Sequence, residues 1–336
     1  MLNLITDVPG LLIGHAHDLK IGSGTSVILC DRPTVAAVDI RGASPGTRET
    51  DLLSPGAMVG AVDAIVLSGG SAFGLDAAGG VMAWLAEQGR GFKVGSARVP
   101  IVSAAILFDL LNGGDKTWGG TPPYRDFGYE AARTAASGVF ALGTIGAGAG
   151  ATTATVKGGL GSASAISPTG HVVGALVAVN AYGNPLVDAG PWFRAAPYER
   201  HGEFGGRGLP VPWPDETHPR LKGQATRANT TIAVIATDAV LTPAAARRFA
   251  VMAQDGYALS LFPAHAPPDG DCLFALATGR TFFEGGPEQE TQLGATAAHV
   301  MARAIARGVF EATALPVPGA QMDWKTRFGT SAQAKP

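Results

Sequence analysis

The chain has 336 residues, of which 46% are hydrophobic and 15% are charged, and its net charge is −2 at pH 7. This composition argues against a disordered chain, because disorder needs high charge and little hydrophobicity, and the length allows a large buried core. The balanced charge provides no attraction to nucleic acid or to an anionic membrane, and no apolar run approaches the ~18 residues of a membrane span.

The first third of the chain alternates short apolar runs with glycine turns. Residues 25–30 (TSVILC) and 35–40 (VAAVDI) have the composition of strands, and the intervening residues 31–34 predict a hairpin turn. Residues 64–67 (AIVL) predict a buried strand. Residues 73–87 carry apolar side chains at helical spacing, which predicts a helix that ends before a glycine.

The middle of the chain is rich in glycine and alanine between residues 143 and 164. A strand-like run follows at 172–179 (VVGALVAV), so we interpret the glycine-rich stretch as close-packed backbone near a site rather than as a linker. Residues 185–228 are rich in proline, glycine and charge, which predicts an exposed loop.

The composition of the chain changes at residue 230, from polar and proline-rich to β-branched and apolar. Residues 230–236 (TTIAVIA) predict a strand, and Thr242 followed by Pro243 predicts the start of a helix that ends near Gly256. A strand at 272–277 and a helix over roughly 292–312 complete the pattern.

These elements predict an α/β fold in one domain over residues 1–324, built from two sheets with outer helix layers. The polar residues 325–336 predict a disordered tail. The N-terminus carries Asp7 and no basic region, unlike a signal peptide, so we expect a cytoplasmic protein. Cys30 and Cys272 match no metal or redox spacing, which predicts two buried free thiols.

The junction between Asn229 and Thr230 joins a polar, proline-rich segment to the start of a buried strand. A nucleophilic N-terminal threonine needs this arrangement, since its hydroxyl must lie on a rigid strand while the upstream chain leaves. Its free α-amine, with an unperturbed pKa of about 7.7–8.0, can act as general base near neutrality. Self-cleavage would proceed by attack of the Thr230 hydroxyl on the Asn229 carbonyl, an N-to-O acyl shift and hydrolysis of the ester. Threonine is also common at ordinary strand starts.

Short motifs in a fixed order run through nearly the whole chain. They are ITDVPG at 5–10, GH at 14–15, DIRG at 39–42, LSGGSAFG at 67–74, PIVSAAILFD at 100–109, the glycines of 146–150, VN at 179–180, NTTI at 229–232 and DGD at 269–271. In this order they resemble the DmpA-like aminopeptidase family, which includes L-aminopeptidase D-amidase/esterases, β-peptidyl aminopeptidases and the nylon-oligomer hydrolase.

The resemblance implies an αββα sandwich of the DmpA/ArgJ-like N-terminal-nucleophile hydrolase type. It implies self-cleavage into a large chain, 1–229, and a small chain, 230–336, that stay together as one domain. It also implies a homo-oligomer, commonly a tetramer, with no metal and no cofactor. Small amides or short peptides are the default substrates, and oligomers of ω-amino acids are an alternative.

Carried over by position, Thr230 is the implied nucleophile and Asn229 supplies the cleaved carbonyl. Asn180 is implied to hold the developing oxyanion, and one such side-chain donor is worth about 10²–10³ in rate. From the residues alone, Asn180 is more often an ordinary strand-end cap.

The resemblance also assigns Asp269 and Asp271 to positioning the nucleophile and its amine, and Lys157 to a place near the nucleophile. From the residues alone, the acidic pair is typical of a turn, and Lys157 is typical of a solvated loop. The Asp-x-Asp pattern differs from the Ser-x-Glu of the β-peptidyl branch, which makes β-peptides a less expected substrate.

The turn Gly69–Gly70–Ser71 is expected to shape the substrate pocket with backbone N–H groups at a helix start. Phe108 belongs to the same expected pocket and stands where some relatives carry a tyrosine, so it cannot supply a phenol hydroxyl. Ser71 resembles the nucleophile of a serine hydrolase, but that motif needs a small residue where Phe73 stands, and neither His265 nor His299 has a convincing context.

Other motifs point to no cofactor. The glycines at 146, 148 and 150 lack the strand and acidic residue of a dinucleotide site, and Lys157 does not complete a P-loop. His15 and His17 would face one side of a strand but lack a third metal ligand. Two alternatives stay open: an acyltransferase similar to ornithine acetyltransferase, and an uncleaved scaffold without activity.

Overall fold

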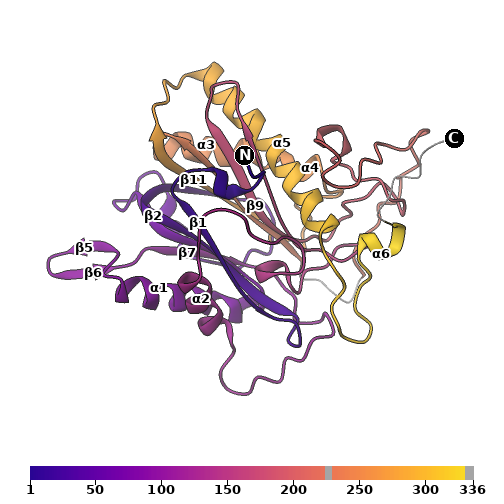
Figure 1. The fold of residues 1–336 in the computed structure, drawn as a ribbon, viewed down its shortest axis with the longest axis horizontal. Helices are drawn as coiled ribbons and strands as arrows, with labels where there is room; N and C mark the ends of the chain where they lie inside the picture. The colour runs from indigo at the N-terminus through magenta and orange to yellow at the C-terminus, as the bar shows by residue number, and fades with distance from the viewer. Residues whose placement is uncertain (224–228, 330–336) are drawn as a thin grey trace.

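A bent sheet enclosed by helices forms the centre of the molecule (Figure 1). The computed structural model describes residues 1–223 and 229–329. The strands are β1 (Leu11–Asp18), β2 (Ser23–Ile40), β3 (Thr47–Arg48), β4 (Ala61–Ser68), β5 (Phe92–Val94), β6 (Ala97–Val99), β7 (Val102–Ile106), β8 (Leu160–Ile166), β9 (Val172–Asn180), β10 (Thr230–Ala239) and β11 (Cys272–Thr281). The α-helices are α1 (Ala77–Glu87), α2 (Tyr124–Arg133), α3 (Pro243–Ala253), α4 (Asp255–Ala258), α5 (Pro287–Phe310) and α6 (Trp324–Phe328).

The strands pair in the order β3-β7-β4-β2-β11-β10-β9-β8, with β1 also on β2, and β5 and β6 form a separate hairpin. The β10–β11 and β4–β7 pairs are parallel, whereas β9 lies antiparallel to β10. This order places β10 in the interior of the sheet, between β9 and β11. The start of β10 is therefore held from both sides by backbone hydrogen bonds.

The long strand β2 joins two halves of the sheet. Its first part pairs with β1 and β4, and its last part pairs with β11. The hairpin predicted at 31–34 is therefore wrong, because the chain continues in one direction along β4 with a register shift between Leu29 and Thr34. Turn-forming residues also suit such an irregularity, and Pro33, which has no N–H to donate, is tolerated there.

Side chains alternate between two cores along each central strand, as expected for a sheet covered on both faces. In β10, Ile232 and Val234 belong to a core between the two halves of the sheet, together with Ile65 of β4. Ala233, also in β10, belongs to a second core with α3 and α5. A third core lies between β4 and helices α1 and α2.

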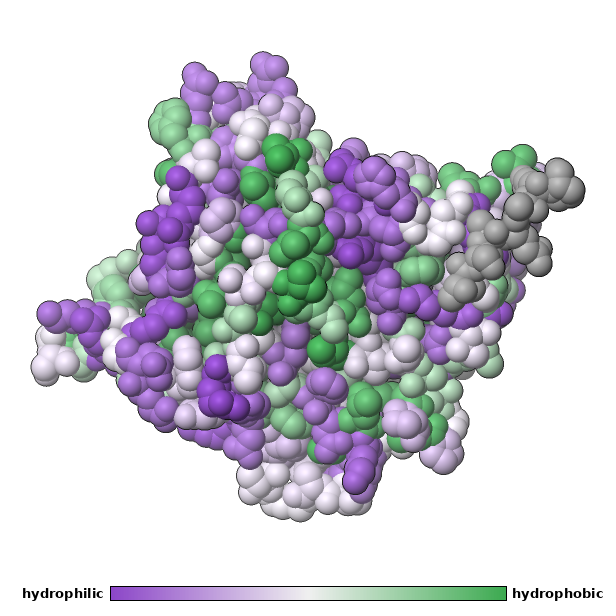
Figure 2. Space-filling model, viewed as in Figure 1, coloured by the Kyte–Doolittle hydropathy of each residue, from purple (hydrophilic) through white to green (hydrophobic). Residues whose placement is uncertain are grey.

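The elements therefore stack in four layers (Figure 1). Helices α1 and α2 form the first layer, the two halves of the sheet form the second and third, and helices α3 and α5 form the fourth. This confirms the α/β class and the arrangement of two sheet layers between helices. The two layers are one hydrogen-bonded sheet joined through β2, rather than two separate sheets. On the face shown in Figure 2, hydrophobic residues gather in a band between hydrophilic margins, as a chain with only 15% charged residues allows.

The predicted strands at 64–67, 172–179, 230–236 and 272–277 correspond to β4, β9, β10 and β11. Thr242 caps α3 by accepting a hydrogen bond from the N–H of Ala245 at 3.2 Å. The helix predicted over 73–87 begins as a 3-10 turn and becomes α-helical at Ala77. The final helix, α5, starts earlier than predicted because Pro287 occupies its first turn.

Residues expected to be exposed or disordered are partly ordered and buried. Phe193 and Phe204, in the predicted exposed loop, pack with Trp324 of α6. Residues 325–328 of the predicted tail belong to α6, while 224–228 and 330–336 lie outside the described residues. Within the described part of the chain, no helix is long and apolar enough to cross a membrane.

The glycine-rich stretch packs its backbone directly against other backbone, as interpreted from the sequence. A Cβ on Gly158 would lie 2.0 Å from the Val179 carbonyl oxygen, and one on Gly148 would lie 2.1 Å from the Leu160 nitrogen. Gly161 of β8 meets α5 in the same way, since its Cβ would lie 1.9 Å from the Ala304 carbonyl oxygen. Glycine is therefore required for the helix to contact the sheet at this distance.

We expect Gly161→Ala to lower the free energy of unfolding by about 1–3 kcal/mol or more, because the added methyl group forces α5 away from β8. Gly56→Ala is the matched control, since no atom lies within 4 Å of its Cβ position, and it should change stability by less than about 0.5 kcal/mol. Chemical denaturation of both variants measures the difference. Equal stabilities would contradict the close approach.

Candidate active site

Thr230 is the first residue of β10, and only 3% of its surface is exposed. It lies directly opposite Asn180, the last residue of β9, in the antiparallel register. Opposite residues in such a pair project their side chains on the same face. That face is the one on which Ile232 points into the core between the sheet halves. The register therefore places the Thr230 and Asn180 side chains together at one end of the sandwich.

Two donors converge on the carbonyl oxygen of Asn229. The Thr230 hydroxyl donates to this oxygen, and the Gly270 N–H donates to it at 2.8 Å. Asn229 itself is held in a parallel bridge to Asp269. A Cβ on Gly270 would lie 2.8 Å from Thr230 Oγ1, so glycine is what permits this backbone to approach the hydroxyl.

The Asp271 carboxylate holds the start of β10 in place through hydrogen bonds. Its Oδ1 accepts the Thr231 N–H at 2.9 Å, and its Oδ2 accepts the His265 N–H at 3.0 Å. The His265 Nδ1 lies 2.9 Å from the same oxygen. Tyr257 packs against the His265 ring and donates to the carbonyl oxygens of Thr231 and Cys272 at 3.2 and 3.1 Å. Burial, reinforced by the Asp271 carboxylate, raises the Tyr257 pKa well above its usual value, so this hydroxyl is a neutral donor.

Asp269 lies beside Asn229, to which it is joined by the parallel bridge. Its carboxylate oxygens accept the N–H groups of Tyr182 and Ala266 at 3.1 and 3.2 Å. Burial and the neighbouring Asp271 raise the pKa of Asp269. The acidic pair predicted from the sequence is therefore brought to the Asn229–Thr230 junction. Its described hydrogen bonds go to neighbouring backbone N–H groups and to the His265 ring, not to the Thr230 hydroxyl.

The Asn180 side chain makes three close polar contacts. Its Oδ1 accepts the Thr152 N–H and the Lys222 ammonium, each at 3.0 Å, and its Nδ2 donates to the Phe108 carbonyl oxygen at 2.9 Å. This is more than a strand-end cap, because the amide links three segments that are distant in sequence.

Lys222 is a residue of the site that sequence reasoning missed. Its ammonium also donates to the Thr152 carbonyl oxygen at 3.2 Å. Burial lowers the Lys222 pKa to about 7, although Asp269 and Asp109 favour the charged form. A single lysine in a proline-rich loop carries no local signal, so only the folded chain identifies it.

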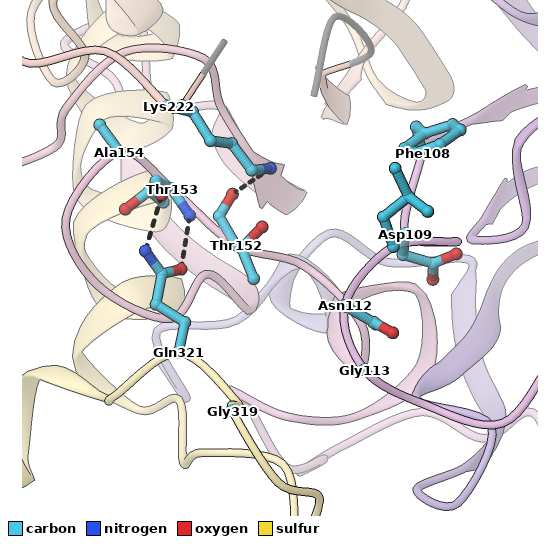
Figure 3. A pocket seen from close by; sticks show the side chains of 12 residues that line it. Phe108, Asp109, Asn112, Gly113, Thr152, Thr153, Ala154, Lys222, Gly319 and Gln321 are labelled. Atoms are coloured by element: carbon cyan, nitrogen blue, oxygen red, sulfur yellow. Dashed lines mark hydrogen bonds between the residues drawn. The ribbon is translucent and has the colours of Figure 1, made fainter. Parts of the chain in front are cut away.

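A cavity of about 460 Å³ lies beside Asn180. In Figure 3, Phe108 and Asp109 lie on one side of it, Thr152 on the other, and Lys222 reaches toward Thr152. Among the described residues, its lining is formed by Phe108, Asp109, Leu111, Asn112, Gly113, Thr152, Thr153, Ala154, Lys222, Gly223, Gly319 and Gln321. The expected pocket residue Phe108 thus lines the cavity and also contacts Asn180 through its carbonyl group.

The turn Gly69–Gly70–Ser71 is not among the described lining residues of this cavity, but it holds one of them, Asp109. The Gly70 N–H donates to Asp109 Oδ1 at 2.8 Å, and the Ser23 hydroxyl donates to Asp109 Oδ2 at 2.7 Å. Burial raises the pKa of Asp109. The backbone N–H expected to line the pocket therefore holds a buried carboxylate instead.

Lys157 is 1% exposed, which excludes the solvated-loop interpretation. Its ammonium donates to the carbonyl oxygens of Gly148 and Gly158 at 3.1 and 2.8 Å. Burial lowers its pKa to about 7, with Asp109 opposing and Lys222 reinforcing the shift. Lys157 thus lies within electrostatic reach of the Asn180 side of the site, and its described hydrogen bonds do not go to Thr230.

Of the histidines in the competing motifs, His265 lies at this site beside Asp271, whereas His299 and His15 lie elsewhere in the fold. His265 contacts Asp271, and His299 stacks on Tyr198 with 4.6 Å between ring centroids. His15 bonds to the Ser26 hydroxyl at 2.9 Å, and burial lowers its pKa to about 4. Among the described residues, no three His, Cys, Asp or Glu side chains lie together in a group that could hold a metal ion. Both cysteines, Cys30 and Cys272, are buried free thiols, as predicted.

Comparison with known proteins agrees with the resemblance to an aminopeptidase family over nearly the whole chain. A family model of peptidase family S58 matches residues 3–322. An uncharacterized aminopeptidase of Mycobacterium tuberculosis is 46% identical over 342 residues, which covers 95% of this chain and 96% of that protein. A 6-aminohexanoate-oligomer endohydrolase of a Kocuria species is 29% identical over 316 residues, covering 89% of this chain and 84% of that one.

Two solved structures share the fold at low sequence identity. A β-aminopeptidase of a Burkholderia species has a TM-score of 0.70 at 23% identity, covering 97% of this chain and 91% of that chain. The L-aminopeptidase D-Ala-esterase/amidase of Ochrobactrum anthropi, a variant of the Ntn hydrolase fold, has a TM-score of 0.72 at 20% identity, covering 98% and 95%. With this fold and a family match across nearly its full length, the chain belongs to peptidase family S58 and is a peptidase or amidase of the DmpA type.

Proposed function

We propose that the chain cuts itself between Asn229 and Thr230, and that the freed Thr230 then hydrolyses amide bonds of short peptides or aminoacyl amides. The observation that carries the proposal is the convergence on the Asn229 carbonyl oxygen. The Thr230 hydroxyl and the Gly270 N–H both donate to this oxygen. The nucleophile is thus next to the carbonyl it would attack, and a backbone donor is in place for the negative charge that develops there.

In the self-cleavage step, the Thr230 oxygen forms a bond to the Asn229 carbonyl carbon. The hydroxyl proton passes to the Thr230 nitrogen as the Asn229–Thr230 C–N bond breaks, which leaves an ester and a free amine. Water then hydrolyses the ester, giving an Asn229 carboxylate and restoring the Thr230 hydroxyl. The bridge from Asn229 to Asp269 would hold the scissile segment still during attack.

In the mature enzyme, the Thr230 α-amine takes the proton of its own hydroxyl as the oxygen attacks the substrate carbonyl. The amide of Asn180, on the same face of the sheet, donates to the oxyanion. Collapse of the tetrahedral intermediate expels the substrate amine, which receives the proton, and water releases the acyl group from Thr230. Asp271 holds the start of the strand through the Thr231 N–H.

Membership of a peptidase family supports transfer of the acyl group to water rather than to another amine. The cavity of about 460 Å³ suits a small substrate, and its wall mixes apolar Phe108 with polar groups such as Asn112 and Gln321. Short peptides and aminoacyl amides are therefore the first substrates to test, with oligomers of ω-amino acids next. The homo-oligomer and independence from cofactors stay predictions from the resemblance, and the cytoplasmic location stays a prediction from the N-terminal sequence.

Thr230→Ala should yield one full-length chain without hydrolase activity, because no hydroxyl remains to attack Asn229. Thr231→Ala is the matched control: its side chain lies next along β10, and its hydroxyl has no hydrogen-bond partner in the described structure. Intact mass and N-terminal sequencing should show fragments 1–229 and 230–336 in the wild type and the control. A Thr230→Ala protein that still splits or turns over substrate would refute the assignment.

Asp271→Asn should fold and lose most turnover, with kcat lower by about tenfold or more, because hydrogen bonds to a buried charged group are worth about 1.5–3 kcal/mol. An amide oxygen cannot accept from both Thr231 and His265 as the two carboxylate oxygens do. Asp126→Asn on the exposed face of α2 is the control. Steady-state kinetics measure kcat, and circular dichroism shows whether each variant is folded. A normal kcat in folded Asp271→Asn would exclude Asp271 from the mechanism.

A further inference from the structure

We propose that Lys222 is a positioning residue for the oxyanion site: its ammonium binds the Asn180 amide oxygen, fixes the orientation of that amide and strengthens its N–H donors. This inference rests on the proposed function and adds to it a residue that the motifs do not identify. Lys222 would act through Asn180 rather than on the substrate.

Two donors at its oxygen and one acceptor at its nitrogen fix the orientation of the Asn180 amide. The Lys222 ammonium and the Thr152 N–H each lie 3.0 Å from Asn180 Oδ1. Reversing the amide would bring its NH₂ group against two donors. The nitrogen therefore faces the other way, where it donates to the Phe108 carbonyl oxygen at 2.9 Å. Since an amide nitrogen carries two N–H groups, one remains for a substrate oxygen.

The positive charge of Lys222 polarises the Asn180 amide, which a neutral donor such as the Thr152 N–H cannot do. A cation at the amide oxygen draws electron density away from the nitrogen, and hydrogen bonds in series polarise one another, most strongly where water is excluded. The charged groups that face Lys222 are Asp269 and Asp109, which favour the ammonium form, and Lys157, which opposes it. Two carboxylates thus favour the charged form of the group that polarises the Asn180 amide.

Lys222 has anchors that do not depend on the Asn229–Thr230 bond. Its backbone N–H donates to the Tyr182 carbonyl oxygen at 2.9 Å, and its ammonium donates to the Thr152 carbonyl oxygen at 3.2 Å. Tyr182 is in turn held by its N–H bond to Asp269. Cleavage after Asn229 breaks none of these bonds, so Lys222 stays beside Asn180 in the mature enzyme.

The test compares kcat and KM of Lys222→Met and Lys222→Arg with those of the wild type, using a short aminoacyl amide. Lys93→Met is the matched control, because Lys93 lies on the exposed hairpin strand β5. All four proteins should self-cleave. The Asn229 carbonyl oxygen accepts a hydrogen bond from the Gly270 N–H, whereas the Asn180 amide donates to the Phe108 carbonyl oxygen, so self-cleavage does not depend on Asn180. Intact mass confirms this before rates are measured.

For Lys222→Met we expect kcat to fall by about 10- to 100-fold, the range for loss of a hydrogen bond to a charged group, with KM changed less than about threefold. Lys222→Arg should recover most of kcat. An unchanged kcat in Lys222→Met would overturn the proposal. So would a raised KM at constant kcat, which would instead assign Lys222 to substrate binding.

The pH profile provides a second readout that a purely structural role would not move. Because the Lys222 pKa is lowered to about 7, its charge is present below that pH and is lost above it. The guanidinium of Lys222→Arg stays charged throughout, so the ratio of its kcat to that of the wild type should rise from about pH 6 to about pH 9. A constant ratio would overturn the proposal, even if Lys222→Met does not fold. An uncut, inactive wild type would overturn the proposed function itself.

Discussion

The antiparallel register of β9 and β10 is the constraint on which the site depends. It sets Thr230 opposite Asn180, and alternation along the strand turns both side chains toward the space between the sheet layers. A slip of one residue would move Thr231 into this place and turn the hydroxyl of Thr230 toward the helices. The apolar residues that follow, Ile232 and Val234, prevent such a slip because both are buried in the core between the layers.

Buried ionisable groups gather on the Asn180 side of this strand pair. Lys157 and Lys222 both have pKa values lowered to about 7, and Asp109 has a raised pKa. Burying such groups costs free energy that an apolar core would not, so the fold would be more easily stabilised without them. Perturbed ionisable groups beside a cavity are typical of functional sites. Here the acids and amines partly neutralise one another around the cavity that Phe108 and Thr152 line.

Close backbone packing at glycines also shapes this region. Gly270 lets its N–H reach the Asn229 carbonyl oxygen beside the Thr230 hydroxyl. Gly158 and Gly161 let the glycine-rich segment pack against β9 and α5. A backbone N–H such as that of Gly270 cannot reorient as a side chain does, so in the proposed mechanism this donor is preorganised for the developing negative charge.

Local signals in the sequence determined the central strands, the Thr242 cap and the junction at Thr230, because alternation, capping and composition act over a few residues. Motif order added Asn180, Asp269 and Asp271, which the folded chain brings to that junction. Only the tertiary structure decided that residues 23–40 form one strand, since pairing with β4 overrides turn-forming residues. It alone also revealed Lys222, because contacts between distant segments leave no local pattern.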